Sequence, residues 1–250
     1  MPETESRGFS LIWRGVAAES LGVRAARLPP VTTAAPRRRR IALPGRSGDL
    51  PLAAEEGYAC CRRRIPLLLS PGSDLRRVRD WLRGEGTLVL GNEPDRALAA
   101  AVSGETRFEP IPGRRFFAEA VFDCQPLKAA WPAPEPVAAD VEAGALTLYN
   151  PGDVVARPVC TVEGSGTVAL SVGEASVEMD LEAAGAAACV IDTGEGTFTD
   201  PADGRSLTEF GRVSDHGLRG LWLPARAETA ITWRGEGLTA LTVRPEWRWL

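Results

Sequence analysis

The sequence lacks the long apolar runs and the leader composition of membrane and exported proteins. No run approaches the roughly eighteen apolar residues that a membrane-spanning helix needs. Residues 1–10, MPETESRGFS, are polar and acidic, whereas a signal peptide begins basic and continues apolar. We therefore expect a chain that is neither exported by a signal peptide nor embedded in a membrane.

Metal-binding and disulfide patterns are also missing. The cysteines are odd in number, there is a single histidine, and no C-x-x-C spacing brings two thiolates onto one metal. The cysteines are Cys60, Cys61, Cys124, Cys160 and Cys189. We expect no metal, no cofactor, no disulfide framework and a reducing environment.

Signatures of nucleotide binding and hydrolysis are absent as well. Residues 163–169, EGSGTVA, match G-x-G-x-x-A, but they lead into an alternating strand pattern where dinucleotide binding requires a helix. There is no Walker sequence and no G-x-S-x-G elbow. Ser214, Asp215 and His216 are sequence neighbours, which does not form a catalytic relay. We therefore predict that the protein is not an enzyme.

What the chain does have is enough apolar content for a core and an uneven distribution of charge. Its 250 residues are 44% hydrophobic. Residues 1–130 carry 21 basic against 15 acidic side chains, a net charge of +6, whereas residues 131–250 carry 8 against 18, a net charge of −10. The two halves therefore present different electrostatic surfaces to partners.

A proline-rich segment separates these halves. Residues 131–144, WPAPEPVAADVEAG, contain three prolines and end in glycine, a composition typical of an extended linker. We predict two domains, residues 1–130 and residues 145–250, joined by this linker.

The first half combines one helix with strands. In residues 74–84, DLRRVRDWLRG, the apolar side chains fall on one helical face, Ser73 can cap the helix and Gly84 can end it. TLVL, the turn GNEPD and RALAAAV then predict a hairpin, and residues 114–126 alternate like a half-buried strand. This half is predicted to be α+β and rich in strands.

The second half predicts an antiparallel sandwich or jelly roll, because short alternating strands recur between glycines without a helical period. The predicted strands are ALTLYN, PVCTVEG, TVALSVG, SVEMDL, CVIDT, LWLPA, TAITWRG and LTALTVRP.

Two groups of side chains are candidates for binding. The run Arg37, Arg38, Arg39 and Arg40 precedes IALPGR, which adds Arg46. Without interleaved aromatic residues it lacks the stacking platform of a single-strand nucleic-acid binder, so we favour a solvated or interface strand.

Trp222 and Trp233 lie in predicted strands of the second domain. Either tryptophan can stack on a sugar or fill the sandwich core, and we favour the core.

The order of these segments resembles the distal tail protein family of long-tailed, non-contractile bacteriophages. The resemblance covers most of the chain. In the first half it runs through GFSLIWRG, PGRSG (residues 44–48), Tyr58, DWLRGEGTLVLGNEPD (residues 80–95) and VFDCQPL. In the second half it runs through LYNPGDVVARPVCTVEGSG (residues 148–166) and residues 222–250.

This resemblance implies a mainly β fold. The first domain would be a split β-barrel with a hairpin and one packed helix, and the second a galectin-like, carbohydrate-module-like antiparallel sandwich. The helix would pack on the barrel through Leu75, Val78, Trp81 and Leu82. Backbone turns would fall at Gly45, Gly48, Gly84, Gly86, Asn92 and Pro94.

The resemblance also implies a function. The chain would be a virion structural protein, a homo-hexameric ring at the tail tip, assembled in the cytoplasm of the host bacterium. The tail tube protein would lie above the ring and the tail-tip hub protein below it. The lumen would hold the tape measure protein and then passing DNA, in a phage, a prophage remnant or a gene transfer agent. The outer sandwich would be a docking module or would read a host-surface saccharide; the alternative is a free carbohydrate-binding module without ring assembly.

Overall fold

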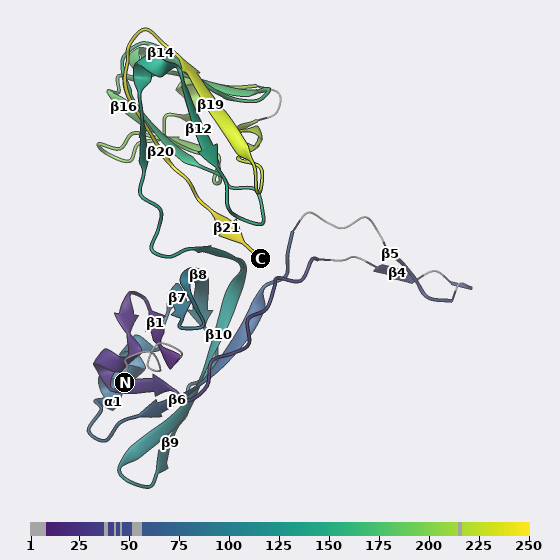
Figure 1. The fold of residues 1–250 in the computed structure, drawn as a ribbon, viewed down its shortest axis with the longest axis vertical. Coiled ribbons are helices and arrows are strands. Elements are labelled where there is room, and N and C mark those ends of the chain that lie inside the picture. The colour runs from purple at the N-terminus through teal and green to yellow at the C-terminus, as the bar shows by residue number, and fades with distance from the viewer. Residues whose placement is uncertain (1–8, 38–39, 43, 46, 52–56, 215–216) are drawn as a thin grey trace, which may run out of the picture. The chain divides into compact units, whose positions relative to one another are not determined.

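The computed structural model describes residues 9–37, 40–42, 44–45, 47–51, 57–214 and 217–250 (Figure 1). The chain divides into two compact units, residues 1–132 with Leu250 and residues 133–249. No helix in the described part of the chain is long and apolar enough to cross a membrane.

The boundary lies inside the predicted linker, but most of residues 131–144 fold with the second unit. Val137–Ala139 forms strand β11 and Val141–Ala143 forms the 3-10 helix η3. β11 hydrogen-bonds to strand β20 of the second unit, and Asp140 caps η3 by accepting from the Glu142 amide. The linker is therefore shorter than predicted, because these backbone groups find partners in the sandwich.

The first unit is one curled antiparallel sheet with the order β2-β1-β7-β8-β10-β6-β3 and with β9 paired to the start of β10. β2 and β3 lie at opposite ends of this order, yet only η2 and Gly22 separate them along the chain. The sheet must therefore curl until its ends approach each other, which gives a half-barrel. The elements are β1 (Leu11–Trp13), β2 (Val16–Ala17), η2 (Ala18–Leu21), β3 (Val23–Ala25), β4 (Arg40–Ala42), β5 (Asp49–Pro51), β6 (Cys61–Leu69), α1 (Leu75–Trp81), β7 (Glu85–Leu90), β8 (Glu93–Val102), β9 (Phe108–Ile111) and β10 (Arg115–Ala130).

Helix α1 is attached to the half-barrel by two reciprocal tryptophan hydrogen bonds. The indole N–H of Trp13 donates to the Trp81 carbonyl at 2.9 Å, and the indole N–H of Trp81 donates to the Trp13 carbonyl at 3.1 Å. Trp13 also meets Phe122 edge to face, with ring centroids 5.0 Å apart. Val78 and Leu82 are buried in the same core, and Leu75 packs against it. The helix is thus held by packing and by hydrogen bonds that satisfy the indole N–H groups of both Trp13 and Trp81.

The ends of α1 differ from the prediction. Asp74, not Ser73, is the N-cap, because its carboxylate accepts from the amides of Arg76 and Arg77. The Ser73 hydroxyl donates instead to the carbonyls of Gly22 and Ser70. After the helix, Gly84 has φ +71°, a left-handed conformation that glycine adopts without steric cost.

The hairpin that follows is tighter than predicted. Leu90 pairs with Glu93, so the turn consists of Gly91 and Asn92 alone, and Pro94 lies in β8. The pairing register shifts at this point, and an irregular site of this kind tolerates the missing N–H of proline. Gly86 lies inside β7, where an added Cβ would come within 2.6 Å of the Arg14 side chain. It therefore serves close packing and is not a turn.

The second unit is an antiparallel sandwich of two five-stranded sheets, β11-β20-β13-β16-β17 and β12-β19-β14-β15-β18. Inward side chains of both sheets form its core, so the predicted mainly β, two-layer class is confirmed. The remaining elements are β12 (Ala145–Tyr149), β13 (Val159–Gly164), β14 (Thr167–Val172), β15 (Ala175–Asp180), α2 (Leu181–Ala184), β16 (Ala188–Asp192), β17 (Thr197–Thr199), η4 (Thr208–Phe210), β18 (Gly211–Val213), η5 (Leu218–Gly220), β19 (Glu228–Arg234), β20 (Leu238–Arg244) and β21 (Arg248–Trp249).

Candidate functional site

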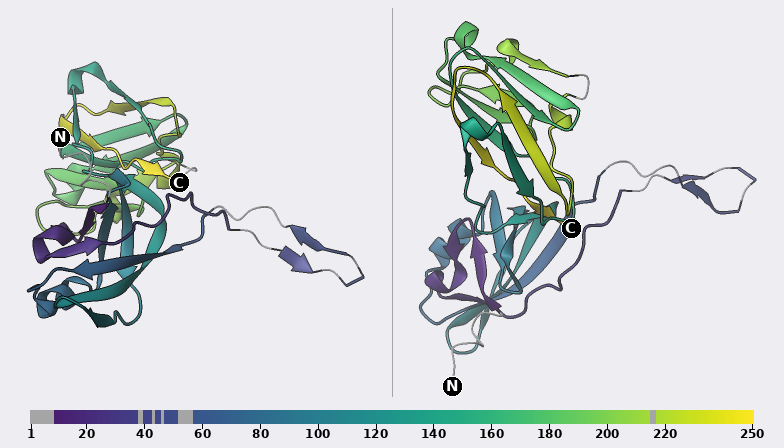
Figure 2. Two further views of the ribbon diagram at one scale, coloured as in Figure 1. Left: turned by 60° about the horizontal axis from the view of Figure 1, so that its bottom comes forward. Right: turned by 45° about the horizontal axis from the view of Figure 1, so that its top comes forward.

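Residues 31–60, here called the arm, connect β3 to β6, and the two strands described within them, β4 and β5, form a ribbon. β4 and β5 pair with each other from Arg40↔Pro51 to Ala42↔Asp49. Nearer the sheet, the Arg37 amide donates to the Gly57 carbonyl at 3.0 Å and the Ala59 amide to the Ala35 carbonyl at 2.8 Å. Figure 2 shows β4 and β5 outside the curled sheet in both views. The arm residues whose burial the structure describes (31–37, 44–45, 47–48 and 57–60) are exposed or half-buried.

Two polar side chains hold the chain where it enters the arm. The Asn92 side-chain amide, from the β7–β8 turn, donates to the Pro29 carbonyl at 2.9 Å. The Arg63 guanidinium, from β6, donates through Nη1 to the Pro30 carbonyl at 2.8 Å. Arg63 and Asn92 therefore fix the direction in which the arm leaves the sheet.

The candidate interface arginines are only partly described. Arg37 is exposed at the base of the arm, and Arg40 is the first residue of β4. Arg38, Arg39 and Arg46 lie outside the described residues. Gly45 and Gly48, between β4 and β5, have φ of +79° and +82°, so the chain reverses there through left-handed positions that favour glycine.

The outer face of the sheet beside the arm carries opposed charges. On neighbouring strands β6 and β10, Arg62 lies 2.8 Å from Asp123, and Arg64 lies 3.6 Å from Glu119. The hydrogen bond from Arg62 lowers the pKa of Asp123. Both pairs are exposed and screened by solvent, so they set the charge pattern of the surface and contribute little to stability.

Beneath that face lies an ion pair that the sequence reasoning missed. Lys128 of β10 places Nζ 2.6 Å from Oε1 of Glu93, and the Lys128 side chain is 5% exposed. Lys128 is the only lysine in the chain. The sequence could have indicated that Lys128 is buried, because the two-residue alternation of β10, continued past Pro126, puts Lys128 on the core side.

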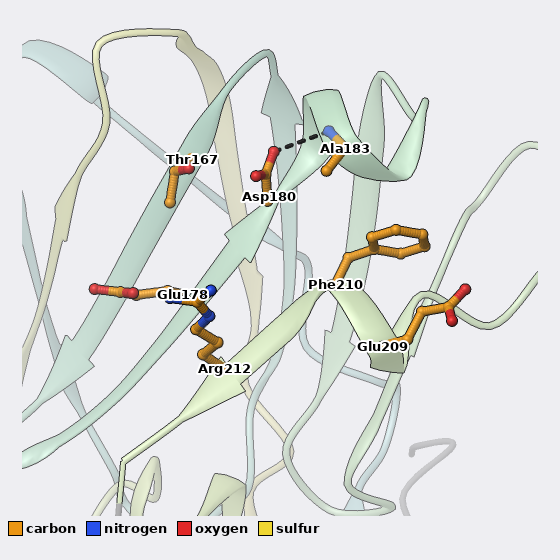
Figure 3. Close-up of a pocket in the computed structure, with 7 residues that line it drawn as sticks. All are labelled: Thr167, Glu178, Asp180, Ala183, Glu209, Phe210 and Arg212. Atoms are coloured by element: carbon orange, nitrogen blue, oxygen red, sulfur yellow. Dashed lines mark hydrogen bonds between the residues drawn. The ribbon is translucent and has the colours of Figure 1, made fainter.

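In the second unit, a solvent-exposed hollow of about 240 Å³ lies against β14, β15 and β18 (Figure 3). Glu178 stands directly opposite Arg212 in the strand register. The Asp180 carboxylate already accepts from the Ala183 amide at 2.9 Å. No group of three or more histidine, cysteine, aspartate or glutamate side chains in the described parts of the chain is placed to hold a metal ion.

The two tryptophans considered for stacking on a saccharide differ in burial. Trp233 is buried in the sandwich core, and its indole N–H donates to the Val141 carbonyl at 2.9 Å. It has no free ring face, so the stacking role is wrong for Trp233 and the core interpretation holds.

Trp222 is 42% exposed and lies outside the strands, so the predicted strand LWLPA is absent. The neighbouring Leu223 is fully buried and exchanges two backbone hydrogen bonds with Ala156, at 2.8 and 2.9 Å. The buried Asn150 also donates to the Leu223 carbonyl at 2.9 Å. This fixed backbone turns Leu223 inward and leaves the Trp222 ring accessible.

No protein-family model matches the sequence, and no curated protein sequence matches it. Among solved structures, the chain is similar to the crystal structure of the Dit protein (gp 19.1) of phage SPP1, described as a paradigm of the hub adsorption apparatus of phages that infect Gram-positive bacteria. The chain has the Dit fold. The match covers 95% of this chain and 98% of that chain, with a TM-score of 0.60 and 14% sequence identity. It therefore includes both units and their order along the chain.

Proposed function

We propose that the chain is a structural, non-enzymatic distal tail protein, a ring subunit that joins the tail tube to the tail-tip hub of a long-tailed phage or a phage-derived particle. The observation that carries the proposal is the Dit fold over 95% of the chain, which extends through both units. A partial match to the sandwich alone would fit any binding module. The two-unit arrangement instead supports a component of the tail tip.

Ring closure requires each copy to offer two different complementary surfaces, since the contact is head to tail and closes by rotation. The arm supplies one of them. Its two strands pair only with each other among the described elements. Such strands keep free backbone groups that can add to another chain. Six copies would enclose a lumen for the tape measure protein and then DNA.

The first experiment is light scattering after size exclusion across a range of concentrations. We expect a species of about six times the 26.7 kDa of one chain, in equilibrium with the monomer. A strict monomer at every concentration would contradict self-assembly of the ring.

The same experiment tests the arm arginines. Replacing Arg37 to Arg40 with serine is expected to raise the concentration needed for half assembly by about tenfold, because charged contacts with the neighbouring copy are lost. The matched control replaces four exposed arginines outside the arm, Arg24, Arg76, Arg77 and Arg107, and should assemble like the wild type. If both variants raise the concentration needed for half assembly equally, the effect comes from net charge and not from the position of the arginines in the arm.

The exposed ring of Trp222 favours a second, peripheral role for the sandwich, the binding of a host-envelope saccharide. On an array of bacterial envelope glycans, Trp222→Ala should abolish binding while ring assembly is unchanged. Phe9→Ala is the control, because Phe9 is an aromatic residue of the first unit that is 50% exposed. If the Trp222→Ala variant still binds the glycans, Trp222 is not the binding residue. If the wild type binds no glycan, the sandwich is a docking module only.

A further inference from the structure

We propose that Cys61 and Cys124 are a modification site, a cysteine pair that oxidises to a disulfide and ties β6 to β10 at the base of the arm. The inference goes beyond the proposed function and does not depend on ring assembly. It rests on the strand register, on the shared face of the two side chains and on a buried cation beside them.

The register places the two cysteines directly opposite each other. Cys124 of β10 pairs with Cys61 of β6 in an unbroken antiparallel ladder that continues to Phe116↔Leu69. Directly opposed residues have Cα atoms about 4.5–5.5 Å apart. Disulfides span about 4.4–6.8 Å between Cα atoms, so the bond can form without moving either strand.

Both thiols point to the core side of the sheet. Cys124 is 1% exposed, and Cys61, at the first position of β6, packs against the same core and remains partly accessible. Burial is the main cause of the raised pKa of Cys124, and the neighbouring Cys61 side chain adds to it. One sulfur is thus reachable from solvent, and the other lies directly behind it.

Arg63 provides a positive charge beside this pair. It lies two residues after Cys61 on the same strand face and is 6% exposed, and its Nε has no hydrogen-bond partner. Burial raises the pKa of the Cys124 thiol to about 12, and the charge of Arg63 acts in the opposite direction. The guanidinium beside the two opposed thiols therefore offsets part of the cost of forming the Cys124 thiolate.

The other cysteines serve as internal controls. Cys160 pairs with Ile191 and Cys189 pairs with Val162, so these two are diagonal neighbours, about 7–8 Å apart. This separation exceeds what a disulfide spans. Cys60 is exposed and contacts the Gln125 side-chain oxygen at 3.8 Å, so it is accessible but does not face Cys124.

The oxidant is a low-molecular-weight disulfide such as oxidised glutathione. The Cys61 thiolate attacks one glutathione sulfur, forming a mixed disulfide and releasing one glutathione thiolate. The Cys124 thiolate then attacks Cys61 Sγ, forming the intramolecular bond and releasing the second glutathione. Two protein thiols are oxidised, one glutathione disulfide is reduced, and the two protons pass to the two glutathione thiols.

The bond would act on the arm. Cys61 directly follows the returning strand of the arm, where Ala59 still pairs with Ala35. Linking Cys61 to the central strand β10 would fix this end of the arm to the sheet. In a reducing cytoplasm the pair stays as thiols, and in an oxidising environment it closes.

The test incubates the full-length wild-type protein with oxidised glutathione at pH 8, blocks free thiols with N-ethylmaleimide and maps tryptic peptides by mass spectrometry. We expect a crosslink between peptides 47–62 and 116–128, a mass loss of about 2 Da and a Tm higher by about 5 °C or more. Cys60→Ser should keep the crosslink and Cys61→Ser should lose it.

Three results would overturn the proposal: no crosslink between the two peptides, a crosslink that Cys60→Ser abolishes, or an equally fast crosslink between Cys160 and Cys189. The peptide map of the wild-type protein tests the proposal without any variant. A folding defect in Cys61→Ser therefore does not affect the outcome of the test.

Discussion

Replacing Trp81 with alanine is expected to lower the free energy of unfolding of the first unit by about 3–5 kcal/mol. The change removes a buried indole from the contact between α1 and the half-barrel, together with its hydrogen bond to the Trp13 carbonyl. Cavity formation and the loss of a buried hydrogen bond both oppose folding. Hydrogen exchange followed by mass spectrometry measures the effect unit by unit, and the loss should be confined to residues 9–132.

Two variants sharpen this prediction. Trp13→Phe keeps most of the ring volume but removes the indole N–H that donates to the Trp81 carbonyl, so it should cost about 1–3 kcal/mol. Trp222→Ala removes an exposed indole from the second unit and should leave the stability of the first unit unchanged. Equal exchange in Trp81→Ala and in the wild type would show that α1 does not hold the half-barrel.

Replacing Lys128 with alanine is the second change with a large expected effect, a loss of about 3–5 kcal/mol. It removes a buried ammonium and leaves the Glu93 carboxylate in a site where its side chain is only 20% exposed. An unpaired charge in such a site is costly. Urea unfolding followed by circular dichroism measures the change.

The matched control is the exposed pair of Arg62 and Asp123, with side chains 58% and 47% exposed. Arg62→Ala should cost far less than Lys128→Ala, because solvent screens that pair. The double variant Lys128→Met with Glu93→Gln should recover most of the loss, since it leaves no unpaired charge. A double variant as unstable as Lys128→Ala would show that packing of the lysine side chain, not charge pairing, dominates at this site.

The parts of the fold that could be predicted are those in which one periodic pattern decides the structure. The i, i+3 and i+7 spacing of Leu75, Val78 and Leu82 predicts the buried face of α1, and the alternation up to Cys124 predicts the core side of β10. These patterns are local, so no knowledge of partner strands is needed.

The errors fall where partners distant in sequence decide the outcome. Val137–Ala139 looks like a linker until β20 supplies its hydrogen bonds, and Ser73 is diverted from capping α1 by the carbonyls of Gly22 and Ser70. Trp222 and Trp233 both lie in segments that the sequence predicts to be strands, yet only Trp233 faces the core. The pairing of Lys128 with Glu93 depends on the β8–β10 register, which no single segment encodes.

The central claim is that this chain builds a closed ring, and cryo-electron microscopy of the largest species from size exclusion tests it most directly. The account predicts class averages with sixfold symmetry, the half-barrels around a lumen and each arm on the neighbouring copy. Open filaments, a ring closed through the sandwiches, or particles in which the arms contact no neighbour would contradict it.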